Sequence, residues 1–153
     1  DLSMRTYPNS TESIIRRYRK EAPHLNVYAA FDPYRRAPWK ELEDVARKKE
    51  AGACGFFTQP VFDYKLFDLC REWLQGENVF WGLSPVIGPR SRSYWETTNH
   101  IVFPKDFSTT LESNIAFAQT VLRELGQDKG SAYLMPVRVK LEHYLPALLD
   151  AVA

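Results

Sequence analysis

The stretch CGFFTQPVFD, residues 54–63, joins a short apolar run to an abrupt polar end at Thr58 and Gln59. Short runs of aromatic and β-prone residues predict buried strands. Three other runs have the same character and predict further strands: NVYAAF at 26–31, NVFWGL at 78–83 and SAYLMPV at 131–137. A short fifth strand is possible at residues 100–103.

Helical patterns separate these apolar runs. Pro38 suits the first turn of a helix that ends before Gly52, and Asp63 suits the cap of another that ends at Gly76. Strands that alternate with helices and are apolar along both faces predict an α/β protein with a parallel sheet. Four main strands fit either a small open sheet or half of an eight-stranded barrel.

Composition limits the kinds of partner. The chain has 153 residues, 44% of them hydrophobic, which suits one domain spanning residues 1–153. Its formal net charge of +1 gives no reason to expect nucleic acid or an anionic membrane as a partner. Cys54 and Cys70 are widely spaced with no histidine cluster beside them, so we predict no metal site and a reducing, cytoplasmic location. No apolar run reaches the roughly 20 residues of a membrane span.

Candidate ligand-binding residues follow the predicted strands, because ligands of parallel α/β folds bind at the carboxyl ends of strands. These positions hold Asp32, Thr58, Gln59, Ser84 and Arg138. The Gln59 amide can donate and accept at once, which suits the edge of a heterocycle, and the Arg138 guanidinium suits a carboxylate or a ring. The alternatives are that Gln59 satisfies loop backbone and that Arg138 is a surface residue.

Several segments, in order, resemble the second half of the methylenetetrahydrofolate reductase family, whose members are flavin-dependent (β/α)8 barrels. The resemblance covers roughly 120 residues. The segments are RKKEAGACGFFTQPVFD at 47–63, VFWGLSPVIGPRS at 79–91, IVFP at 101–104, NIAFAQTVLRELGQ at 114–127 and SAYLMPVRV at 131–139.

This resemblance implies a TIM-type barrel of which the chain forms about the carboxyl-terminal half, completed by a missing amino-terminal half or by another chain. It implies reduction of 5,10-methylenetetrahydrofolate to 5-methyltetrahydrofolate, with FAD as cofactor and NAD(P)H as electron donor. It also implies that Gln59 binds the pterin, that Arg138 supports the folate, and that Asp1 is the catalytic residue, either as the acid or by tuning the chemistry electrostatically. Arg47 and Lys48 match a basic pair that holds the flavin phosphates.

The flavin-binding segment departs from the family pattern. In AAFDPYRRAPW, residues 29–39, Phe31 replaces a tyrosine of the flavin site and Arg35 falls near a histidine position. Phe31 keeps an aromatic ring that can pack on a flavin. These departures motivate an alternative, a flavin-free folate-binding or regulatory relative. A third possibility is an α/β domain that has no small-molecule site and acts in assembly.

Overall fold

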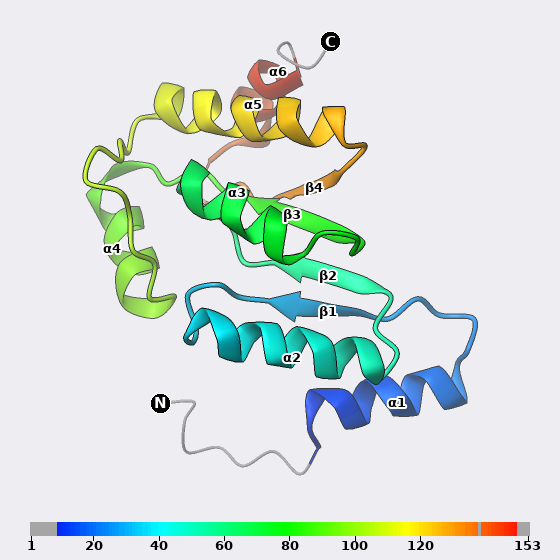
Figure 1. Cartoon of the computed structure of the whole chain (residues 1–153). Coiled ribbons are helices and arrows are strands. Elements are labelled where there is room, and N and C mark those ends of the chain that lie inside the picture. Colours follow the sequence, from blue (N-terminus) through cyan, green and yellow to red (C-terminus); the bar gives the residue numbers. More distant parts are fainter. Residues whose placement is uncertain (1–8, 138, 150–153) are drawn as a thin grey trace.

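A computed structural model describes residues 9–137 and 139–149, in which helices and strands alternate along most of the chain (Figure 1). The strands are β1 (Tyr28–Phe31), β2 (Gly55–Thr58), β3 (Val79–Leu83) and β4 (Ser131–Leu134). The helices are α1 (Thr11–Glu21), α2 (Pro38–Glu50), α3 (Tyr64–Trp73), α4 (Gly88–Thr98), α5 (Leu111–Gln127) and α6 (Leu141–Leu149). None of the described helices has the length and hydropathy needed to cross a membrane.

The four strands form one parallel sheet in the order β1-β2-β3-β4. The predicted α/β class and parallel sheet are therefore confirmed. The possible strand at residues 100–103 is wrong, because this segment is irregular. His100 has a φ of 57°, which breaks an extended run, and the Ile101 amide donates to the Trp95 carbonyl at the end of α4.

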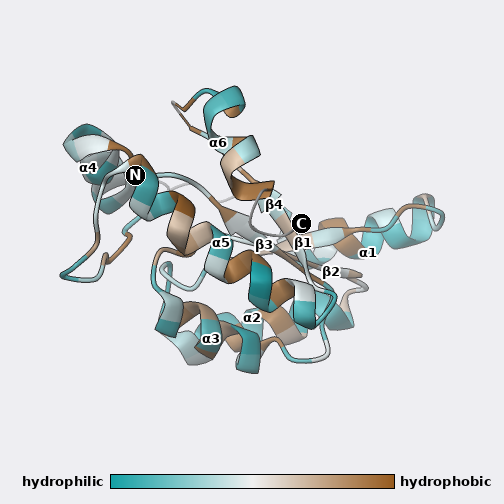
Figure 2. Ribbon diagram, turned by 90° about the horizontal axis from the view of Figure 1, so that it is seen from above, coloured by the Kyte–Doolittle hydropathy of each residue, from teal (hydrophilic) through white to brown (hydrophobic). Residues whose placement is uncertain are grey.

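One face of the sheet carries the main core. Helices α2, α3 and α5 gather on this side (Figure 2). Alternate strand residues point toward them, as the two-residue period of a strand requires, and Phe56 and Trp81 are buried there with Phe67 of α3 and Val121 of α5. Burial of each large side chain contributes about 1.5 to 3 kcal/mol, so this layer holds the sheet together.

The opposite face carries four aromatic side chains, which we call the aromatic face: Tyr28, Phe57, Phe80 and Tyr133. Their ring centroids lie 4.7 to 5.7 Å apart in adjacent pairs. Phe57 is still 39% exposed. Within the described part of the chain, the outer edges of β1 and β4 have no strand neighbour. The sheet thus leaves one apolar face and two edges uncovered.

A second apolar cluster attaches α4 to the carboxyl ends of the strands. Phe62, which follows β2, packs edge-on against Trp95 of α4 at 5.2 Å and against Phe103 at 5.1 Å. In α4 the Gly88 φ of 75° makes the turn into the helix, and Pro89 suits its first turn. This docking places α4 at the end of the sheet to which the strands point (Figure 1).

Candidate functional site

Gln59 is fixed by backbone hydrogen bonds just beyond β2. Its amide N–H donates to the Phe31 carbonyl at 2.7 Å, so the ladder between β1 and β2 continues past the last strand residue. Two residues further, the Val61 N–H donates to the Gly82 carbonyl at 3.4 Å. Pro60 and Val61 are buried. The apolar PVF segment therefore closes the strand end and leaves Gln59 held between two backbone contacts.

A tightly packed crossing of side chain and backbone lies on the aromatic face of the sheet, next to the strand end that carries Gln59. The Tyr133 hydroxyl of β4 crosses over Gly82 of β3 and donates to the Thr58 carbonyl of β2 at 2.5 Å. A side chain at Gly82 would place its Cβ 2.7 Å from that hydroxyl. The Thr58 hydroxyl accepts from the Gly82 N–H at 3.0 Å. Only glycine leaves room for the crossing tyrosine, which ties three strands together.

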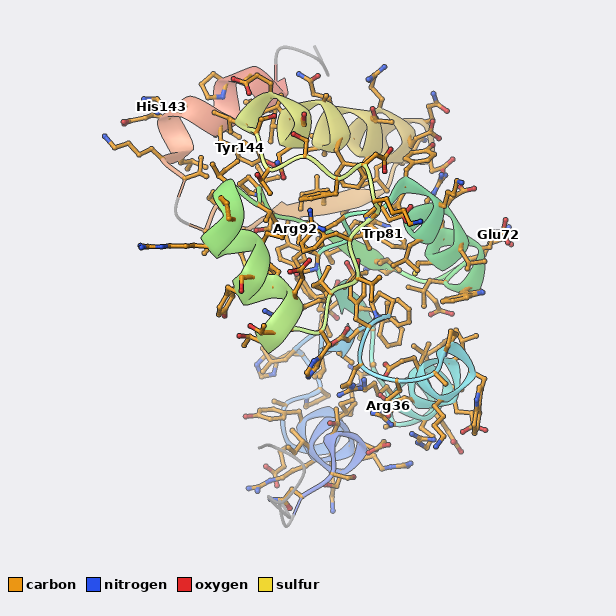
Figure 3. All side chains as sticks on the ribbon, turned by 90° about the vertical axis from the view of Figure 1, so that its left-hand side faces the viewer. Arg36, Glu72, Trp81, Arg92, His143 and Tyr144 are labelled. Atoms are coloured by element: carbon orange, nitrogen blue, oxygen red, sulfur yellow. The ribbon has the colours of Figure 1, made fainter. Side chains whose placement is uncertain are left out.

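A cavity of about 410 Å³ lies between the strand ends and α4. Figure 3 looks toward this end of the molecule, with α4 in front. The cavity volume falls within the roughly 300 to 1,000 Å³ of small-molecule sites. It is lined by Gln59, Ser91, Tyr94, Trp95, Asn99, Met135 and Val137.

An amide pair lines one side of the cavity. Gln59 Nε2 donates to Asn99 Oδ1 at 3.1 Å, which joins the end of β2 to the residue that caps α4. Among the described residues, no hydrogen-bond partner is found for Gln59 Oε1 or Asn99 Nδ2. One acceptor and one donor therefore remain for a ligand that presents both kinds of group. Among the described residues, the partner of the Gln59 side chain is another side chain and not the loop backbone of the alternative interpretation.

The segment leading into α4 is held by a buried asparagine. Asn114 of α5 accepts from the Val86 N–H at 2.9 Å and donates from Nδ2 to the Val86 carbonyl at 3.2 Å. The same Nδ2 donates to the Thr110 carbonyl at 2.7 Å. Because Val86 lies just before α4, Asn114 fixes the position of the helix that roofs the cavity.

The other strand ends supply polar groups that are already satisfied. The Ser84 hydroxyl after β3 donates to the Met135 carbonyl at 2.8 Å. Asp32 after β1 accepts from the Tyr34 N–H at 3.0 Å, and burial raises the pKa of its carboxyl group. Both side chains shape turns at the carboxyl ends of their strands. Asp1 and Arg138, predicted as catalytic acid and folate contact, lie outside the described residues.

The three residues predicted to hold the flavin lie elsewhere. Phe31 is buried in the core on the helix-covered side of the sheet, so its ring does not reach the cavity. Lys48 donates from Nζ to the Asp44 carboxylate at 2.6 Å and to the Ala30 carbonyl at 2.7 Å. Arg47 is paired with Asp44 and with Glu12 at 2.9 and 3.2 Å. As described, these side chains do not fit a flavin: the ring is covered and the cations are paired.

Asn99 and Trp95 line the cavity but were not singled out in the sequence. The signal for Asn99 was weak, since asparagine commonly ends helices and TTNH predicts little beyond that. Trp95 reads as core, and it is indeed buried. Both are brought to Gln59 by the docking of α4, a long-range contact that no local pattern encodes.

Comparisons with known proteins leave the family of this chain open. No family model matches the chain, and no curated protein matches it. No group of three or more His, Cys, Asp or Glu side chains that could hold a metal ion occurs among residues 9–137 and 139–149.

Proposed function

We propose that this chain binds the pterin ring of a reduced folate in the cavity beside Gln59. The observation that carries the proposal is the Gln59–Asn99 amide pair at the carboxyl end of a parallel sheet. A pterin edge presents donors and acceptors side by side. The Gln59 oxygen and the Asn99 nitrogen, which have no hydrogen-bond partner among the described residues, offer the complementary pair. Tyr94, Trp95 and Met135 give the same cavity apolar walls against which a flat ring can pack.

The proposal includes a larger barrel of the methylenetetrahydrofolate reductase type. Consecutive parallel strands with helices on one side are the arrangement of βα units in a (β/α)8 barrel. The aromatic face and the free edges of β1 and β4 would then be covered by four further units, from an amino-terminal half or another chain. In that barrel the aromatic face becomes interior packing.

The reaction that we propose for the complete barrel is reduction of 5,10-methylenetetrahydrofolate to 5-methyltetrahydrofolate. Hydride adds to the methylene carbon, the bond from that carbon to N10 breaks, and N10 takes a proton, with NAD(P)H as the source of the hydride. The contribution of the described residues is to bind and orient the pterin. The proposed reaction includes no flavin, although the family resemblance implies one, because Phe31, Arg47 and Lys48 do not fit it.

A second candidate is a folate-binding or regulatory relative that does not catalyse the reduction. The observation that favours it is the pairing of Arg47 and Lys48 with carboxylates, together with the burial of Phe31. Folate binding is common to both candidates. Oxidation of NAD(P)H that depends on methylenetetrahydrofolate separates them, since only the reductase shows it.

Fluorescence titration of the full-length protein with 5-methyltetrahydrofolate tests the binding proposal. We expect Gln59→Ala to weaken binding by about 1 to 3 kcal/mol, because a polar ligand edge loses its partner. This corresponds to an increase in Kd of about 5-fold to 150-fold. The matched control is Gln127→Ala, an exposed glutamine at the end of α5. Equal affinities of the wild type and Gln59→Ala would contradict the proposal.

A further inference from the structure

The polar side of α2 carries an unusual set of buried charges. Glu41, Asp44 and Lys48 are only 1%, 6% and 3% exposed. Their spacing of three and four residues puts them on one face of the helix. Charged side chains are almost never buried unless they are paired, so each of these groups needs a partner within the fold.

Arginine side chains around the cluster supply those partners. Glu41 accepts a hydrogen bond from Arg35 at 3.1 Å and forms an ion pair with Arg36 at 3.0 Å. Asp44 is paired with both of these arginines at 3.2 and 3.6 Å. Figure 3 shows Arg36 beside α2. Together with Arg47, which joins Asp44 to Glu12 of α1, the cluster contains four cations and three carboxylates. We call these seven side chains the α2 ion network.

Lys48 also connects the network to the sheet. The carbonyls of Val27 and Phe31 accept hydrogen bonds from the segment that contains β2. Because carbonyls alternate in direction along a strand, the Ala30 carbonyl points to the outer edge of β1. Lys48 donates to it there at 2.7 Å. The lysine thus satisfies a carbonyl at the outer edge of β1.

We infer that the α2 ion network is a closed structural unit that does not hold the phosphates of a flavin, so that folate binding by this protein is independent of flavin. A flavin pyrophosphate would have to separate the buried Lys48 or the partly exposed arginines from Asp44 and Glu41 and leave these buried carboxylates beside a second anion. Like charges at that distance in a buried site are strongly unfavourable. The four cations and three carboxylates of the network sum to a net charge of only +1, so little positive charge is left to attract a phosphate. The folate part of the inference rests on the proposed function.

Flavin content and folate affinity of the same full-length preparation test this inference. We expect no flavin absorbance after purification, no saturable quenching of FAD fluorescence on titration, and 5-methyltetrahydrofolate binding that added FAD does not change. Arg47→Ala, which removes a half-exposed cation, and the control Lys40→Ala should both keep the wild-type folate affinity. Saturable FAD binding at one flavin per chain would overturn the inference, most directly if Arg47→Ala abolished it.

The two proposals fail in different ways. If folate does not bind and FAD does not bind, the proposed function fails while the inference about the network stands. The network itself is tested by Lys48→Met against the exposed Lys40→Met on the same helix. We expect a lower midpoint of thermal unfolding for Lys48→Met alone, and equal midpoints would overturn the structural role.

Discussion

The Gln59 cavity and the α2 ion network both contain polar side chains near the carboxyl ends of strands, but they use them in opposite ways. At the cavity, Gln59 and Asn99 share one hydrogen bond and keep an acceptor and a donor free among the described residues. In the network, Lys48 and Asp44 each have several partners. Polar groups without partners beside a cavity indicate a ligand-binding site, whereas buried charges that satisfy one another indicate a structural role.

The face of the sheet to which a side chain points decides whether it can bind a ligand in the cavity or becomes part of the core. Gln59 follows the helix-facing Thr58 and lines the cavity beneath α4, away from the core formed by α2, α3 and α5. Phe31 has the opposite direction and meets the core. Two residues assigned to neighbouring parts of one site can therefore lie on different faces of the same sheet.

Among the changes that test this contrast, we expect removal of the Lys48 ammonium to have the largest effect on stability. We expect Lys48→Met to lower the free energy of unfolding by about 3 to 5 kcal/mol, because Asp44 and the Ala30 carbonyl lose a buried partner. Urea unfolding of the full-length protein measures this, with Lys40→Met as the control. A Lys48→Met protein as stable as its control would mean that the network is not a structural unit.

A change at the crossing of Tyr133 over Gly82 should have the next largest effect. Gly82→Ala puts a Cβ 2.7 Å from the Tyr133 hydroxyl, so the tyrosine must move and the hydrogen bond to Thr58 is strained. We expect a destabilisation of about 1 to 3 kcal/mol.

The matched control for this change is Gly126→Ala in α5. A Cβ at Gly126 meets no atom within 4 Å, and alanine in a helix should stabilise by about 0.5 to 1 kcal/mol. Urea unfolding of both variants decides the point. If Gly82→Ala is as stable as the wild type, the hydrogen bond of Tyr133 across Gly82 does not stabilise the sheet.

Much of the fold could be predicted from the sequence because local patterns encode it. Four apolar runs separated by capped helices gave the parallel α/β class, and Asp63 caps α3 through hydrogen bonds from Lys65 and Leu66. The site was only partly predictable. Gln59 was found from its position after a strand, but Asn99 reaches it across 40 residues, and the pairing of Lys48 depends on Asp44 and on the edge of β1. Such contacts depend on tertiary packing, which spacing in the sequence does not specify.

We expect a smaller effect in acid, where the α2 ion network should lose the stability that Asp44 contributes. Burial opposes ionisation of Asp44, but the hydrogen bond and charge of Lys48, together with Arg36 and Arg47, outweigh it and lower the pKa of this carboxyl below its ordinary value of 3.8. A lowered folded-state pKa contributes stability that is complete above that ordinary value and is lost as the pH falls through the folded value. The stability difference between wild type and Asp44→Asn should therefore shrink as the pH falls below about 4.

Urea unfolding of both proteins between about pH 3 and pH 6 measures this difference. Subtracting the free energy of unfolding of Asp44→Asn from that of the wild type at each pH removes the contribution of the other carboxylates. A difference that stays constant through this range would show that Asp44 gains nothing from its partners in the folded protein.

The most direct test of the central claim is a double-mutant cycle on folate binding. The full-length wild type, Gln59→Ala, Asn99→Ala and the double variant are titrated with 5-methyltetrahydrofolate. If the two amides bind one ligand edge together, each single change weakens binding and the two effects are coupled by about 0.5 kcal/mol or more. Unchanged affinity in all three variants would contradict the claim that the Gln59 cavity is the folate site.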